Sequence, residues 1–212
     1  HLRPRRQRQM CIRDSTKVRS VDESPLVEYR YLSEQQSLPG LVEAKVEGVN
    51  LLSWAQQNWA QLEEQLHHYG VLLFRGFDIH SDEDFSHLVN GLPVELLGYV
   101  ERSTPRKSIS GKVLTSTMYP PEESIALHNE NSALKRIARK LFFFCAQPSP
   151  VGGETPLADA RKVLQRIDPD IREKFRRLGW MLTRNYTRQF GYFWQEAFAG
   201  MTKAEVEDYF HN

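Results

Sequence analysis

A mixed α+β fold around a mainly antiparallel sheet is the fold class that the sequence predicts. Short apolar segments typical of strands alternate with segments of helical period along the chain. The 212 residues are 40% hydrophobic and include four Trp, eight Tyr and eleven Phe, which is enough to build the core of one domain. No apolar run approaches the roughly 18 residues of a membrane span, so no membrane-spanning segment is expected.

The first part of the chain is expected to form two strands, a long helix and a third strand. Residues 26–32 and 41–47 are predicted strands on either side of a turn-like SLPG sequence. Asn50 can cap a helix over residues 51–68, whose apolar side chains recur at helical spacing, and Gly70 supplies its stop. The sequence VLLFRGF that follows predicts a buried strand.

The middle of the chain alternates a helix, a long loop and further strands. Ser81 begins a predicted helix with acidic residues in its first turn. Residues 93–121 scatter Pro, Gly, Ser and Thr between short apolar pieces, a composition typical of active-site loops. Strands are predicted within and after this loop from the sequences KVLTSTMY, LFFFCAQ, TPLAD and WMLTRNY, at residues 112–119, 141–147, 155–159 and 180–186.

Three helices are predicted in the last third of the chain from their capping residues. Asp159 can cap a helix over residues 160–166. Asp168, followed by proline at the first helical position, begins a helix over residues 169–178. Thr202 starts a capping box for the last helix.

The charge distribution separates residues 1–15 from the rest of the chain. This arm carries five Arg and one Asp, a net charge of +4, while the remainder carries 23 basic and 26 acidic residues, a net charge of −3. A basic arm can bind nucleic acid or target a mitochondrion, but RQRQMCIRDS resembles translated sequencing-adapter sequence, so we expect a non-native arm outside the fold. The body then gives no electrostatic case for nucleic acid. The chain has two cysteines, Cys11 and Cys145, which make no disulfide framework and favour a reducing, cytoplasmic compartment.

The sequence IALHNENSALKR places His128 and Glu130 two residues apart. At strand spacing, residues i and i+2 point to the same side, so both side chains can converge on one point. Imidazole plus carboxylate is two thirds of the two-His-one-carboxylate triad that binds Fe(II). Most His-x-Glu pairs are surface polar residues, so the metal hypothesis depends on the setting of this pair, between a proline-rich loop and an aromatic segment.

A second motif, PSPVGGETPLAD, combines a glycine turn with a hydroxyl side chain. Gly152 and Gly153 can serve backbone conformations that are closed to other residues, so a plain tight turn explains the motif equally well. The functional hypothesis places the hydroxyl of Thr155, just past the turn, as a donor to a carboxylate.

Taken in order, HNENS, an aromatic segment, GGETPLAD and RNY resemble the TauD/TfdA family of Fe(II)- and 2-oxoglutarate-dependent oxygenases. The resemblance covers residues 41–212 and extends to the branch of the syringomycin-pathway hydroxylase and the clavaminate synthase-like enzymes. It implies a domain over residues 16–212 with a double-stranded β-helix, or jelly roll, and flanking helices.

The resemblance also implies the chemistry of the site. His128 and Glu130 correspond to iron ligands, with glutamate in place of the commoner aspartate, and Thr155 to a contact of the 2-oxoglutarate carboxylate. O₂ is the other co-substrate. The implied substrate is an amino acid or an amino-acid-derived small molecule, free or tethered to a carrier protein, hydroxylated in secondary metabolism such as antibiotic biosynthesis. Three arginines can contact an anionic substrate: Arg102, Arg106 and Arg184. Each such arginine is more often solvated or structural.

Two residues of the family pattern are missing: a downstream histidine ligand and an arginine for the co-substrate. After Glu130 the only histidine is His211, at the end of a predicted helix, and no arginine follows Arg188. We therefore expect a jelly roll that is incomplete at the C-terminus and a chain that is inactive alone. The alternative is a non-catalytic binding domain of the same fold, and a longer reading frame with a downstream His and Arg decides between them.

Overall fold

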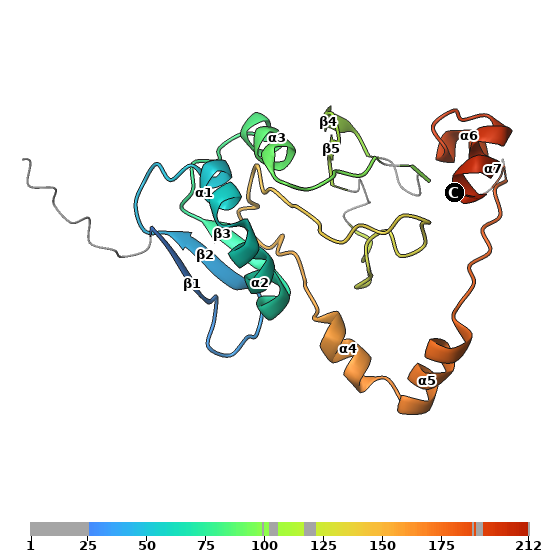
Figure 1. The fold of residues 1–212 in the computed structure, drawn as a ribbon, viewed down its shortest axis with the longest axis horizontal. Helices are drawn as coiled ribbons and strands as arrows, with labels where there is room; N and C mark the ends of the chain where they lie inside the picture. The colour runs from blue at the N-terminus through green and yellow to red at the C-terminus, as the bar shows by residue number, and fades with distance from the viewer. Residues whose placement is uncertain are drawn as a thin grey trace, which may run out of the picture.

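A computed structural model of the chain describes residues 26–98, 100–101, 106–116, 122–187, 189 and 193–211 (Figure 1). The predicted basic arm, residues 1–15, lies outside these ranges. The described residues form helices and two small sheets, which confirms the α+β class. The jelly roll stays a prediction, because the two sheets described have three and two strands. None of the described helices has the length and apolar character needed to cross a membrane.

The larger sheet has the order β1–β2–β3 and contains the strands Val27–Tyr31, Gly40–Ala44 and Leu72–Arg75. β1 and β2 pair antiparallel, as predicted, whereas β2 and β3 pair parallel. The larger sheet is therefore mixed, because the chain returns to β2 through helices, and such a crossover brings the next strand back in the same direction. Antiparallel pairing still predominates, in two of the three strand pairs that the structure describes. Val42, in the central strand, is fully buried.

The predicted long helix is two helices, α1 Leu51–Gln57 and α2 Trp59–Tyr69. The break falls at Asn58, which has a non-helical backbone. Its side-chain amide and its backbone N–H both donate to the Trp54 carbonyl, at 2.8 and 3.0 Å. An asparagine side chain competes in this way with the helical hydrogen-bond ladder, so the apolar period alone does not reveal the break.

The predicted ends of these first helices are confirmed. The Asn50 side chain accepts a hydrogen bond at the start of α1, and Gly70 ends α2 with φ at 79°, in the left-handed region. α3, Asp82–Gly91, begins with a capping box between Ser81 and Asp84. Buried side chains from the three helices then form one apolar cluster against β3, made of Leu51, Ala55, Leu62, Leu88 and Leu92.

The described residues between 93 and 159 form little regular structure. A small hairpin pairs β4 Ser108–Ser110 with β5 Val113–Leu114. The strand predicted over residues 112–119 is confirmed only at β5, and residues 117–121 lie outside the described ranges. The predictions of strands over residues 141–147 and 155–159 are wrong, as is that over residues 180–186. None of these described segments has a neighbouring strand to complete its backbone hydrogen bonds.

The helices of the last third are α4 Ala160–Arg166, α5 Pro169–Leu178, α6 Trp194–Ala197 and α7 Lys203–His211. Asp159 and Asp168 cap α4 and α5 as predicted. α6 was not predicted; it packs with α7 around the buried Phe198. These two helices lie at the end of the molecule opposite the larger sheet (Figure 1).

Candidate metal centre

His128 lies on an irregular segment that leads into a turn, with its side chain 58% exposed. The Nδ1 atom of its ring is 2.8 Å from the carbonyl oxygen of Ala126. A carbonyl can only accept, so Nδ1 is the donor, and in the neutral ring Nε2 keeps its lone pair. A metal-binding histidine is usually oriented by this kind of hydrogen bond to a backbone carbonyl.

The free lone pair of His128 faces the carboxylate of Glu130. The distance from Nε2 to Oε2 is 3.4 Å. In the neutral ring both atoms are acceptors, so they repel one another unless a proton or a metal cation lies between them. An imidazole nitrogen and a carboxylate oxygen are ligands that suit Fe(II), so this pair of residues fits such an ion.

Arg106 holds the other oxygen of the same carboxylate. Its Nη2 is 2.8 Å from Glu130 Oε1, and the two side chains are only 20% and 24% exposed. This charge-assisted hydrogen bond fixes the rotation of the carboxylate and leaves Oε2 directed at His128. The substrate role predicted for Arg106 stays a prediction.

A tight turn follows Glu130 and explains how the pair converges without a strand. Asn131 has φ at 57°, in the left-handed region that asparagine tolerates. The turn is closed by Ser132 N–H donating to the Asn129 carbonyl at 3.4 Å and by Leu134 N–H donating to the Asn131 carbonyl at 3.0 Å. The convergence predicted from strand spacing therefore exists, but a bend in the chain accompanies it in place of a sheet.

Residues 31–210 match the family model described as taurine catabolism dioxygenase TauD, TfdA family. The chain belongs to the TauD/TfdA family. It is 45% identical over 148 residues to the dapdiamide synthesis protein DdaC of Enterobacter agglomerans, a match that covers 70% of this chain and 45% of that protein. It is also 36% identical over 117 residues to the clavaminate synthase-like protein At3g21360 of Arabidopsis thaliana, covering 55% of this chain and 36% of that protein. The match therefore spans less than half the length of either relative.

Among the described residues of this TauD/TfdA chain, the other predicted site residues do not complete a metal centre with His128 and Glu130. Among the described residues, no group of three or more His, Cys, Asp or Glu is arranged to hold a metal ion. His211, exposed at the end of α7, therefore does not complete a triad with His128 and Glu130. Thr155 is exposed in an irregular segment after Gly152 and Gly153, which both have positive φ, and its co-substrate role stays a prediction.

The remaining two arginines give no further support to a substrate site. The guanidinium of Arg184 lies 6.0 Å from the centre of the Tyr186 ring, and its Nη1 donates to the Tyr186 hydroxyl at 3.4 Å. Arg102 lies outside the described residues. The role predicted for both side chains, contact with an anionic substrate, stays a prediction.

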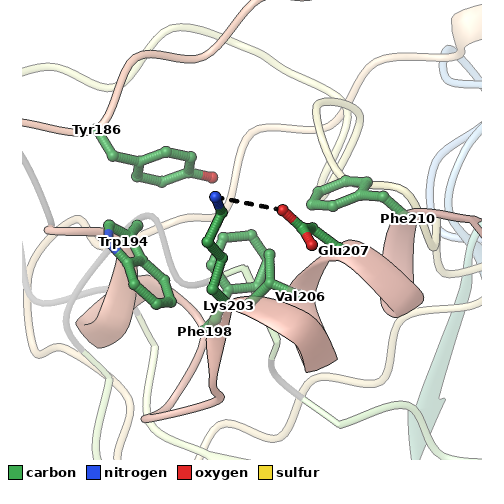
Figure 2. A pocket seen from close by; sticks show the side chains of 7 residues that line it. All are labelled: Tyr186, Trp194, Phe198, Lys203, Val206, Glu207 and Phe210. Atoms are coloured by element: carbon green, nitrogen blue, oxygen red, sulfur yellow. Dashed lines mark ion pairs between the residues drawn. The ribbon is translucent and has the colours of Figure 1, made fainter.

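Sequence reasoning missed a hollow between α6, α7 and Tyr186, with a volume of about 290 Å³ (Figure 2). Its walls are mostly aromatic, and two of the lining residues form an ion pair, with Lys203 Nζ 3.6 Å from Glu207 Oε1. The only sequence signal is the density of aromatic residues on either side of the last capping box. The lining residues are Tyr186, Trp194, Phe198, Lys203, Val206, Glu207 and Phe210.

Proposed function

We propose that the whole protein is an Fe(II)- and 2-oxoglutarate-dependent dioxygenase that hydroxylates an amino acid or an amino-acid-derived small molecule. The observation that carries this proposal is the facing of His128 Nε2 and Glu130 Oε2, 3.4 Å apart, in a chain of the TauD/TfdA family. In that family setting, the lone pair and the carboxylate oxygen suit two ligand positions of a facial triad.

The proposed metabolic role rests on the relatives. One relative is named for dapdiamide synthesis and the other as clavaminate synthase-like. We infer from these names a substrate in secondary metabolism, such as an antibiotic precursor, either free or tethered to a carrier protein. A double-stranded β-helix completed by the whole protein is part of the same proposal, because the family implies that fold.

The residues of this chain have separate tasks in the proposed site. His128 is held in the tautomer that presents Nε2 to a metal by its hydrogen bond to Ala126. Glu130 supplies an anionic oxygen, and Arg106 fixes the orientation of that carboxylate through its second oxygen. Thr155 is proposed to donate a hydrogen bond to 2-oxoglutarate. When bound, the iron with 2-oxoglutarate and O₂ supplies the oxidising chemistry.

Succinate formation by the whole protein tests this function. We expect succinate to appear only with both iron and O₂ present, and His128→Ala to abolish it. The matched control is His80→Ala, since His80 also pairs with a carboxylate two residues away, that of Asp78. We further expect the 212-residue chain alone to form none, because its described residues supply only two ligands. A whole protein that binds the amino-acid substrate but forms no succinate would support the non-catalytic alternative.

A further inference from the structure

Glu101 is a buried carboxylate whose place in the fold was not evident from the sequence. Only 3% of the residue is exposed, and its φ of 58° lies in the left-handed region. Glutamate is almost never fully buried without partners, and a residue other than glycine rarely adopts this backbone conformation. The surrounding contacts must therefore hold Glu101 in place.

Those contacts join three segments of the chain. Glu101 Oε1 accepts a hydrogen bond from the Lys135 backbone N–H at 2.9 Å and another from the Tyr209 hydroxyl at 3.0 Å. The Lys135 ammonium closes the set by donating to the Tyr209 carbonyl and lies 5.3 Å from the centre of the Tyr209 ring. Burial, followed by the hydrogen bond to Glu101, raises the pKa of Tyr209 to about 12, so its hydroxyl stays protonated and donates.

This three-residue set lies at the end of the turn that follows the candidate metal ligands. The turn after Glu130 is closed internally by its two hydrogen bonds and leads directly into Lys135. Before the turn, Arg106 holds Glu130 at 2.8 Å. Glu101 and Arg106 therefore restrain the turn at its two ends, through Lys135 and through Glu130.

We propose that Glu101 is a positioning residue for the His128–Glu130 pair, which fixes the turn against α7 so that the two side chains remain facing each other. The inference rests on the proposed function only in taking these two residues as metal ligands. A ligand pair keeps its geometry when the groups behind it are themselves held by packing and hydrogen bonds. α7 thereby becomes part of the support of the candidate centre.

The ring of His128 reports this positioning without any metal. In the 212-residue chain labelled with ¹⁵N-histidine, NMR distinguishes a ring held with its proton on Nδ1 from a ring that exchanges between tautomers, and His128→Ala assigns the signal. We expect Glu101→Ala to shift His128 toward the exchanging pattern. Glu101→Gln should restore the wild-type pattern, because its amide oxygen can accept from the same two donors.

Two further variants keep the test decisive. Tyr209→Phe removes one hydroxyl and leaves Glu101 in place, so it should shift His128 in the same direction by a smaller amount even if Glu101→Ala fails to fold. Glu43→Ala removes a carboxylate that pairs with Arg30 at the surface of the larger sheet, and it should leave the His128 signal unchanged. Unaltered His128 signals in Tyr209→Phe and in a folded Glu101→Ala would overturn the proposal.

A Co(II) titration of the same proteins separates this inference from the proposed function. We expect Glu101→Ala to weaken Co(II) binding by about tenfold or more, the usual result of losing a group behind a metal ligand. If His128→Ala binds Co(II) as the wild type does while Glu101→Ala still alters the His128 ring, the metal function is wrong and the positioning stands. If Co(II) binds through His128 but Glu101→Ala changes neither the ring nor the affinity, the positioning is wrong and the metal function stands.

Discussion

Two histidine–carboxylate ion pairs, each with one residue between its members, lie in the described part of the chain and differ in their hydrogen bonding. His80 Nε2 is 2.8 Å from Asp78 Oδ1, with side chains 77% and 61% exposed. His128 Nε2 is 3.4 Å from Glu130 Oε2, the carboxylate is only 24% exposed, and the other ring nitrogen donates to Ala126. The distance in the first pair is that of a direct hydrogen bond, whereas the second pair in its neutral form brings two acceptors together.

The comparison teaches that spacing does not identify a metal site, because both pairs have the same spacing. The discriminating features are the partner of the second ring nitrogen and the groups that hold the carboxylate. Asp78 and His80 lie at the start of α3, where the neighbouring Asp84 accepts backbone hydrogen bonds from His80 and Ser81. Asp84 therefore satisfies backbone groups at the helix terminus and Asp78 pairs with the His80 ring, while Glu130 is held by Arg106 and directed at a lone pair.

The largest expected effect separates the two pairs directly. His128→Ala should lower the Co(II) affinity of this chain by more than the roughly 10–100-fold typical of losing an outer partner, because it removes a ligand itself. His80→Ala should leave the affinity unchanged. Calorimetric or optical titration of both variants measures the difference, and equal losses in the two would show that the pairs are equivalent.

The second largest effect is expected at Thr155, whose hydroxyl is proposed to bind 2-oxoglutarate beside the His128–Glu130 pair. In the whole protein, Thr155→Val should raise the 2-oxoglutarate concentration required by about tenfold to a hundredfold, the range expected for a lost charge-assisted hydrogen bond. Thr115→Val is the control, since the Thr115 hydroxyl accepts a hydrogen bond from Lys107 N–H, at 3.0 Å, within the small hairpin. If Thr155→Val unfolds the protein while co-substrate affinity in the folded remainder is normal, Thr155 is structural.

Beside the Asp78–His80 pair, the Ser81 cap of α3 should affect the stability of the fold and not metal binding. Ser81→Ala removes the hydroxyl that accepts a 3.1 Å hydrogen bond from the Asp84 N–H. This should lower the free energy of unfolding by about 1 kcal/mol without changing Co(II) affinity. Chemical denaturation with and without the metal measures both quantities. An altered metal affinity would mean that α3 and the His128 turn are coupled.

The same cap predicts a pH dependence. The backbone hydrogen bond from His80 and then the hydrogen bond with the Ser81 side chain lower the pKa of Asp84. A carboxyl whose folded pKa is below its unfolded value stabilises the protein above the unfolded pKa, and this contribution is lost as the pH falls through the folded pKa. Asp84→Asn should therefore flatten the acid limb of the stability profile, and a limb of unchanged slope would contradict this.

The smallest expected effect concerns the exposed pair itself. Asp78→Ala should change the free energy of unfolding by less than about 0.5 kcal/mol, because exposed ion pairs contribute little after side-chain entropy and solvent screening. Thermal unfolding at low and high salt measures it. A loss well above 1 kcal/mol would show that the pair supports the fold in a way that its exposure does not indicate.

The sequence predicts local features of this fold better than its pairings. Caps such as Asn50 and Asp168 act on residues within one turn, so their chemistry is visible in the sequence. The predicted strands over residues 141–147 and 180–186 failed because a strand depends on a distant partner. The described structure gives them none, and Phe143 and Met181 remain 77% and 89% exposed.

The candidate site divides in the same way. The approach of His128 to Glu130 is local and was predictable, because with only one residue between them the chain limits how far the side chains can separate. The supports of the pair were not predictable. Arg106 lies 24 residues from Glu130 in the sequence, and Tyr209 lies 108 residues from Glu101. No spacing rule connects residues so far apart, so only the folded chain reveals them.

α2 holds both ends of the segment that contains Thr155. Lys140 pairs with Glu63 at 2.8 Å, and Arg161 donates to the carbonyl of His67, in the last turn of the same helix, at 2.7 Å. The segment between residues 140 and 161 is thus a loop whose two ends are both held on α2. Part of the conformational entropy of this loop is therefore already lost when the chain folds. A ligand that contacts the glycine turn loses correspondingly less conformational entropy on binding. Substitution of Glu63 should then weaken the binding of such a ligand, although Glu63 does not itself contact the glycine turn.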